Sequence, residues 1–257
     1  MSFDARVSES QGATLRRPEE LVKIGFERSR VVMMNEAHDG LMRCVRTREV
    51  GRLVLPAAHS VGARHVAMEA MWSRDFVKEA NRTRRVPGGQ RGYLSQPEMR
   101  ALIQDALDLG WMLIAYEADM DSPERPSEDL MSPSVTRWRE EVQAKNLAAA
   151  LNTLPSGSPL FVWCGNSHLS KVPACDWAPM ALHFRNVSGV EAFAIDQTVT
   201  VAWSKDASQE PLIQQFTDQL RRLGGSGGFL VEEGGVPEWT ERDDVDAVVL
   251  SLENDLI

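Results

Sequence analysis

Carboxylates and imidazoles recur in this 257-residue chain directly after short apolar runs that are typical of buried strands. Such groups accept and donate protons and can therefore activate water. The carboxyl ends of parallel strands meet at one edge of an open α/β sheet, and ligands bind in the crevice there. We therefore expect one crevice lined by the five titratable side chains at these positions, which are Glu36, His38, Glu69, Glu117 and His168.

The spacing of Glu36 and His38 points to acid–base chemistry. Two residues apart in an extended chain, their side chains share one face. A carboxylate beside an imidazole raises its basicity and fixes its tautomer. We expect His38, oriented by Glu36 or Glu69, to act as a general base on water that attacks an ester or amide carbonyl. His168 would polarise the carbonyl or protonate the leaving group, and Glu117 would orient an imidazole or the substrate.

The same donors are also adequate for a divalent metal ion, with His38, His168, Glu36 and Glu69 as its ligands. The chain lacks the helical His-Glu-x-x-His signature, which favours a metal-free site without a required cofactor. Nucleophilic catalysis is not favoured, because no Gly-x-Ser-x-Gly elbow is present and Cys164 lies within an apolar run.

Alternating strand and helix patterns must position these residues. Strands are predicted at 30–35, 62–69, 111–117, 159–164, 190–195, 199–203 and 245–252. Helices are predicted at 18–27, 41–55, 72–83, 96–109, 134–153 and 210–223. The helix predicted at 41–55 should end or kink at Pro56. Its solvated face should carry Arg43, Arg46, Arg48 and Arg52. Residues 86–93 suit a lid or connector, and 224–228 a flexible turn.

This pattern predicts a single α/β domain over residues 1–257, with a mainly parallel central sheet flanked by helices and an active-site crevice at the strand carboxyl ends. The formal net charge of −9 argues against binding to nucleic acid or to an anionic membrane. The three cysteines are too irregular for a disulfide framework, and no apolar leader or membrane-length run occurs. We expect a cytoplasmic protein with a small-molecule or peptide substrate, and its oligomeric state stays open.

The order of the motifs resembles the erythromycin esterase/ChaN-like superfamily, whose relatives include TIKI/TraB-type proteins. That pattern has a Gly-Glu-x-His strand end, a second-strand glutamate, an Arg-Asp/Asn pair on a helix and a closing Gly-x-x-His. The matching segments lie within about residues 30–170 and are Asn35-Glu36-Ala37-His38-Asp39, 61–69, Lys145-Asn146 and Gly165-Asn166-Ser167-His168. Asn35 stands in place of the first glycine, and Lys145 in place of the arginine.

The resemblance implies a hydrolase of the esterase type, acting in natural-product metabolism, with a metal-dependent, protease-like form as a variant. From it and from the helix that begins at the crevice, the expected substrate-binding residues are Arg43, Tyr116, Lys145, Asn146 and Asn166. Three alternatives stay open. One is a non-hydrolytic tailoring enzyme that performs elimination or cyclisation. Another is a ChaN-like haem-binding protein with Tyr116, Tyr93 or a histidine as axial ligand. The third is a catalytically inactive partner-binding domain.

Overall fold

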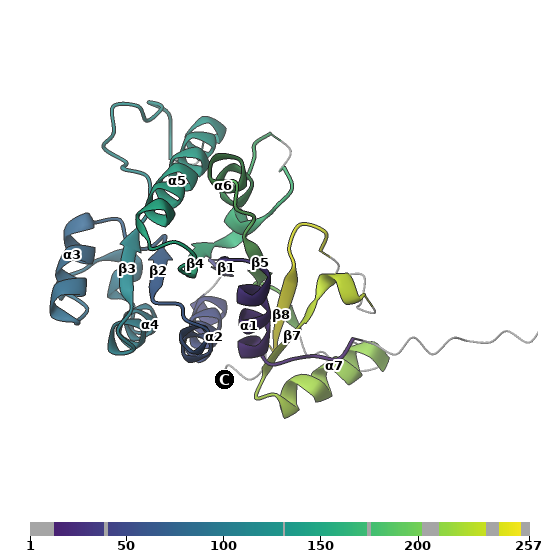
Figure 1. Ribbon diagram of the computed structural model, residues 1–257. Coiled ribbons are helices and arrows are strands. Elements are labelled where there is room, and N and C mark those ends of the chain that lie inside the picture. Colours follow the sequence, from purple (N-terminus) through teal and green to yellow (C-terminus); the bar gives the residue numbers. More distant parts are fainter. Residues whose placement is uncertain are drawn as a thin grey trace, which may run out of the picture.

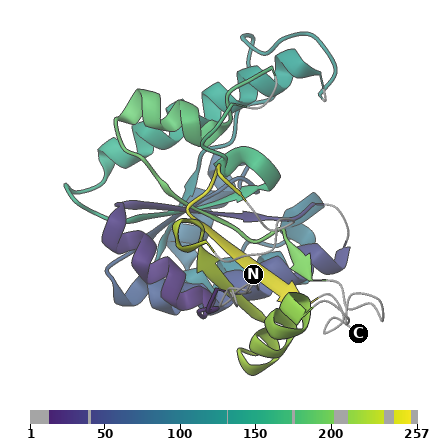
Figure 2. The ribbon, with the colours of Figure 1, turned by 90° about the vertical axis from the view of Figure 1, so that its right-hand side faces the viewer.

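The computed structural model describes residues 13–38, 41–130, 132–173, 176–201, 211–234 and 242–252 (Figure 1). Of residues 41–43, 167, 200, 201 and 211–213 it describes only the backbone. A central sheet runs through the molecule with helices on both of its faces, as the two views show (Figures 1 and 2). The α/β class and the flanking helices are therefore as predicted.

The described segments contain eight strands, and all but one of their pairings are parallel. Six of them follow the order β3-β2-β4-β1-β5-β8; β6 also pairs with β8, and β7 pairs with β8 in the antiparallel sense. The strands are β1 (Val31–Glu36), β2 (His65–Met68), β3 (Met112–Ala115), β4 (Leu160–Gly165), β5 (Phe193–Asp196), β6 (Thr200–Val201), β7 (Ser226–Leu230) and β8 (Ala247–Leu252). The two most central strands, β1 and β4, are buried along their whole length, as expected for parallel strands covered on both faces.

Two helical layers cover the sheet (Figure 1). On one face lie α1 (Pro18–Arg28), α2 (Leu41–Ser60) and α4 (Pro97–Asp108), and on the other α5 (Pro133–Thr153) and α6 (Met180–Ser188). The remaining helices are α3 (Arg74–Thr83), α7 (Pro211–Arg222) and the short 3-10 helices η1 (Gly92–Ser95), η2 (Asn166–Leu169) and η4 (Val231–Glu233). Within the described segments, no helix is long and apolar enough to cross a membrane.

Pro56 does not end α2, which continues to Ser60. A proline inside a helix removes one backbone hydrogen bond and crowds the preceding turn. Here the residues around it, Val54, Leu55 and Ala58, are fully or almost fully buried in the core. Tertiary packing thus maintains the helix beyond the proline.

The flexible turn predicted at 224–228 is wrong in its second half, because Ser226–Leu230 form the edge strand β7. A Cβ atom on Gly228 would lie 2.2 Å from the Val248 carbonyl oxygen. The glycine is therefore needed for close approach to β8, not for flexibility. The structure also contains α6, which the sequence pattern did not predict; it begins after Pro179 and ends at Gly189 in a left-handed conformation.

Candidate active site

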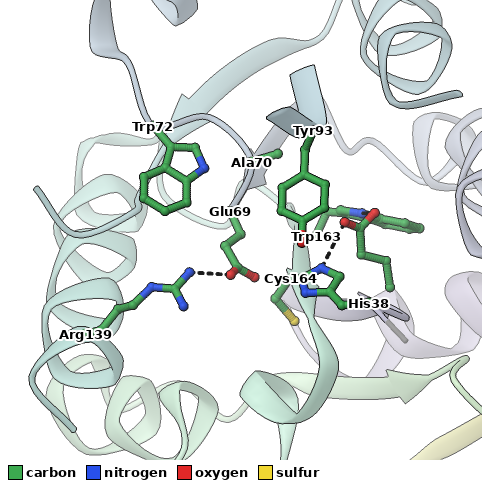
Figure 3. A pocket seen from close by; sticks show the side chains of 9 residues that line it. His38, Glu69, Ala70, Trp72, Tyr93, Arg139, Trp163 and Cys164 are labelled. Atoms are coloured by element: carbon green, nitrogen blue, oxygen red, sulfur yellow. Dashed lines mark hydrogen bonds and ion pairs between the residues drawn. The ribbon is translucent and has the colours of Figure 1, made fainter. Parts of the chain in front are cut away.

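A pocket of about 180 Å³ opens at the carboxyl edge of the sheet (Figure 3). Glu36 and His38 reach it from the end of β1, and Glu69 from the end of β2. β4 contributes Trp163 and Cys164, and helices and connections contribute Trp72, Tyr93 and Arg139. Three of the five titratable residues predicted to share a crevice therefore line this pocket, and Glu117 and His168 lie directly behind it in contact with its lining residues.

The Glu36 carboxylate is buried and held by several donors. Arg48 donates to both of its oxygens, from Nε at 2.8 Å and from Nη2 at 3.1 Å. Trp163 Nε1 donates to Oε2 at 3.1 Å. Burial alone would raise the pKa of Glu36, but the hydrogen bonds from His38 and Arg48 outweigh burial and lower this pKa. Glu36 is therefore an ionised acceptor at neutral pH.

The His38 ring lies against Glu36, with Nε2 at 3.1 Å from Glu36 Oε1. An ionised carboxylate only accepts hydrogen bonds, so Nε2 carries a proton and the lone pair of the neutral ring lies on Nδ1. Tyr93 stacks on the imidazole with ring centroids 5.1 Å apart. Gly165 makes room beneath, because a Cβ at that position would lie 2.4 Å from His38 Cε1.

Glu69 forms the floor of the pocket between two positive groups. Its Oε2 accepts from the Gly165 N–H at 2.5 Å, and its Oε1 accepts from Arg139 Nη2 at 2.5 Å. His168 Nε2 lies 3.5 Å from the same Oε1. Burial alone would raise the pKa of Glu69, but the charges of His168 and Arg139 outweigh burial and hold the pKa well below its usual range.

His168 lies behind the pocket, enclosed by two carboxylates. Its Nδ1 is 2.8 Å from Glu140 Oε1, and Glu140 Oε2 in turn accepts from the Met180 N–H at the start of α6. Burial alone would lower the pKa of the imidazole, but Glu69 and Glu140 outweigh burial and raise the pKa to about 10. His168 is therefore an imidazolium ion at neutral pH, with both nitrogens protonated.

Glu117 is buried and faces Arg139 and Gln143 of α5. Arg139 binds it through Nε at 2.9 Å and Nη2 at 2.5 Å, and Gln143 Nε2 donates to both carboxylate oxygens. The Arg139 guanidinium thus connects Glu117 to Glu69. The guanidinium also lies 5.8 Å from the centre of the Trp72 ring, which is 53% exposed at the mouth of the pocket.

The predicted substrate-binding residues whose side chains are described lie outside the pocket lining. Tyr116 is fully buried, and its hydroxyl donates to the Trp163 carbonyl at 3.2 Å. Asn146 holds the backbone at the end of β3, donating to the Tyr116 carbonyl at 2.9 Å. Lys145 is exposed and pairs with Glu141 on the same helix. The side chain of Arg43 lies outside the described part of the chain.

Asn166 also lies outside the pocket lining, but it contacts the His38 segment directly. Its Oδ1 accepts from the His38 backbone N–H at 3.3 Å, and its carbonyl accepts from Asn35 Nδ2 at 2.7 Å. Asn166 has a φ of +39°, close to the left-handed region that asparagine tolerates. Asn35 also donates to the buried Asp196 at 2.6 Å. Asn35 thus links Asn166 to Asp196 at the end of β1.

Sequence reasoning missed the residues that hold the carboxylates. The expectation that Arg48 lies on a solvated helix face is wrong, because its side chain is fully buried against Glu36. The sequence pattern places Arg139 and Glu140 in the helix predicted at 134–153 and predicts no role at the site for either. The arginine that reaches the pocket from α5 is thus Arg139 rather than a residue at the Lys145 position. One signal was present for Arg48: it lies four residues after Cys44 and seven before Leu55, on the apolar stripe of this helix.

The four proposed metal donors do not suit a metal ion as they lie. The oxygens of Glu36 and Glu69 are engaged by arginines and other donors, and both nitrogens of His168 face carboxylates. Among the residues with described positions, no group of three or more His, Cys, Asp or Glu is arranged to hold a metal ion.

Solved structures similar to this chain share its fold at low sequence identity. A protein from Bacillus cereus is 11% identical with a TM-score of 0.56, and the match covers 95% of both chains. A structure described as bacterial protein toxins is 14% identical with a TM-score of 0.50, covering 71% of this chain and 37% of that one. RRSP, a MARTX toxin effector domain from Vibrio vulnificus, is 16% identical with a TM-score of 0.49, covering 69% and 35%.

No protein-family model and no curated protein matches this chain. The chain spans little more than a third of the length of the two toxin structures. At these identities the similarity concerns the fold alone. None of the three structures is described as an erythromycin esterase or a ChaN protein.

Proposed function

We propose that this protein is a hydrolase in which His38 activates water for attack on an ester or amide carbonyl. The observation that carries the proposal is the contact between Glu36 and His38 in the wall of the pocket, at 3.1 Å. With the Nε2 proton directed at Glu36, the lone pair of the imidazole lies on Nδ1 and can accept a proton from water. Glu36 then stabilises the imidazolium that forms, as a buried carboxylate does beside a catalytic histidine.

The reaction divides into two proton movements at His38. In the first, water attacks the carbonyl carbon while Nδ1 takes the water proton. In the second, the tetrahedral intermediate collapses and Nδ1 returns that proton to the leaving group. His168 is a poor candidate for the acid, since a pKa of about 10 means that it releases its proton too reluctantly near neutral pH. We assign to His168, Glu117 and Arg139 the task of holding Glu69 in place.

The size of the pocket favours hydrolysis over haem binding. At about 180 Å³ it is smaller than the roughly 300–1,000 Å³ of pockets that enclose a drug-sized ligand. Such a pocket suits a single reacting group that projects in from a larger substrate. The proposed haem ligand Tyr116 is buried, with its hydroxyl bound to a backbone carbonyl. The engaged oxygens of Glu36 and Glu69 likewise favour the metal-free form of the site.

Membership in the erythromycin esterase/ChaN-like superfamily is part of this proposal. The support is the convergence of Glu36, His38 and Glu69 on one pocket, with His168 behind it. A role in natural-product metabolism and a small-molecule or peptide substrate follow from the same resemblance. A non-hydrolytic tailoring reaction would use the same base. Incorporation of water into the product distinguishes hydrolysis from such a reaction.

The test is hydrolysis of p-nitrophenyl esters and the matching anilides by the wild type and by His38→Gln. We expect the variant to lose about 10²–10⁴-fold in kcat while its circular dichroism spectrum stays unchanged. In ¹⁸O-labelled water the acid product should carry one label. His59→Gln serves as the matched control, because His59 lies at the far end of α2, outside the pocket lining. Full turnover by His38→Gln, or an unlabelled product, would contradict the proposal.

A further inference from the structure

Tyr93 brings a hydroxyl group into the pocket for which the proposed mechanism has no role so far. The residue lies on η1, after the glycine-rich connection 86–92, and its ring enters the pocket beside His38 (Figure 3). The hydroxyl end of the side chain points toward Glu69 and His38 (Figure 3). Among the described residues, this hydroxyl has no hydrogen-bond partner.

The ring is held from two sides, which fixes the position of the hydroxyl. The imidazole of His38 stacks on it at 5.1 Å with an interplanar angle of 26°. The Arg48 guanidinium lies 5.6 Å from its centre, within the range of a cation–π contact. The neighbouring Leu94 is buried in the core and fixes the 3-10 turn below. A donor fixed in this way needs no reorganisation when charge develops near it.

Three other strong donors at or behind the pocket already bind carboxylates. Arg139 binds Glu69 and Glu117 through Nε and Nη2, so carboxylates neutralise its charge. The indole N–H of Trp163 donates to Glu36. His168 is paired with two carboxylates and does not line the pocket. Trp72 also lines the pocket but is 53% exposed at its mouth, so Tyr93, which stacks on His38, is the neutral donor held beside the proposed base.

We propose that Tyr93 is a catalytic residue that donates a hydrogen bond from Oη to the carbonyl oxygen of the substrate as that oxygen becomes an anion. This assignment rests on the hydrolase function proposed above. When water attacks, the π electrons of the carbonyl move to its oxygen and the water proton goes to His38. The Tyr93 proton stays on Oη throughout, and the hydrogen bond strengthens as charge develops.

The protonation state of Tyr93 fits this role. Burial, and then the negative charges of Glu36 and Glu69, raise the pKa of its phenol above the ordinary value of 10.0. A phenol with a raised pKa remains a hydrogen-bond donor across the physiological range and is a weak general acid. Donation without proton transfer is therefore the favoured role of this group.

Tyr93→Phe tests the assignment, since it removes the hydroxyl and keeps the stacked ring. We expect kcat to fall by about 10²–10³-fold with KM little changed, as for the loss of one oxyanion donor. The factor should be the same for a p-nitrophenyl ester and the matching anilide, because the carbonyl oxygen is common to both. A factor that grows with the basicity of the leaving group would show proton transfer instead and would overturn the assignment.

Ser95→Ala is the matched control for disturbance of the turn. Its hydroxyl donates to the Gly92 carbonyl at 2.7 Å within the same 3-10 helix and is exposed. We expect this variant to retain the wild-type kcat. A comparable loss of activity in Ser95→Ala and Tyr93→Phe would indicate that the turn, not the Tyr93 hydroxyl, matters.

Failure of the inference differs from failure of the proposed function. If His38→Gln loses activity and Tyr93→Phe keeps it, only the role of Tyr93 is wrong. If His38→Gln keeps wild-type activity, the hydrolase mechanism and the role of Tyr93 are both wrong. Binding of an aryl phosphonate, a tetrahedral anionic analogue, adds a measurement independent of turnover: Tyr93→Phe should bind it about tenfold or more weakly than the wild type. Equal affinities would overturn the assignment.

Discussion

The two imidazoles at this site differ in chemistry because of their neighbours, although each lies within reach of a glutamate. His38 contacts one carboxylate whose charge Arg48 already balances, and it lines the pocket. His168 contacts Glu69 and Glu140 and lies behind the pocket. The first arrangement suits a base that gains and loses a proton, and the second suits a permanent cation that orients Glu69.

Stability should depend on the proton of His168. Because the folded state raises its pKa from 6.5 to about 10, its ion pairs contribute fully below a pH of about 6.5 and are lost as the pH rises to about 10. In that window we expect the free energy of unfolding to fall by about 1.4 kcal/mol per pH unit. Glu69 does not add to this slope, since a lowered carboxyl pKa acts only at acid pH.

Urea unfolding of the wild type and of His168→Gln, followed by circular dichroism from pH 6 to pH 10, measures this contribution. The variant should be less stable at neutral pH, because two buried carboxylates lose their partner, and its stability should vary less with pH. Parallel curves for the two proteins would show that His168 is not the titrating group.

At the scale of elements, the site depends on how closely β4 approaches the ends of β1 and β2. β4 pairs in parallel with both strands, and Gly165 ends it opposite Glu36. The Gly165 N–H binds Glu69, and its missing side chain leaves room for the His38 ring. One glycine at a strand end thus allows a carboxylate and an imidazole to meet.

Gly165→Ala should disrupt this meeting point. Its Cβ would lie 2.4 Å from His38 Cε1 and 3.0 Å from Glu69 Oε2, so the imidazole must move. We expect kcat to fall about 10–100-fold and stability to fall by about 1–3 kcal/mol. Gly88→Ala is the control, since a Cβ there meets nothing within 4 Å. Steady-state kinetics and thermal unfolding measure both effects; wild-type activity in Gly165→Ala would mean that His38 need not occupy this position.

At the scale of the molecule, two buried cores share one sheet. One core contains residues of α1, α2, α3 and α4, and the other contains residues of α5, α6 and α7. β1 contributes Val32 and Met34 to the first core and Val31 and Met33 to the second. Alternate residues of one strand therefore connect both layers, which favours unfolding as a single unit.

The prediction of a single domain can be tested on this basis. Phe76→Ala removes a ring from the first core and Phe184→Ala a ring from the second. Each should cost about 3–5 kcal/mol, and each variant should unfold in one transition. Far-UV circular dichroism and tryptophan fluorescence should give coincident curves. Two separated transitions, of which each variant shifts one, would show two independent units.

The strands and helices of the first 170 residues could be predicted because their signals are local. Continuous apolar runs mark strands buried on both faces, and the polar residue after each run marks a strand end. β7 was missed because Ser226–Leu230 contain three small residues and only two apolar ones. Gly228 is required by the close approach of β8 and Gly227 by the approach of Leu223, and a contact of this kind leaves no local pattern.

The same distinction applies to the site. The sequence by itself determined which acids and imidazoles stand at strand ends, because alternation and chain direction decide that. Only the tertiary structure decided their partners: Arg139 reaches Glu69 across 70 residues, and Glu140 reaches the Met180 N–H across 40. The rotation of α5 about its axis and its packing on the sheet select these contacts. Those contacts set the charge of each group, and so make His38 the candidate base and His168 the fixed cation.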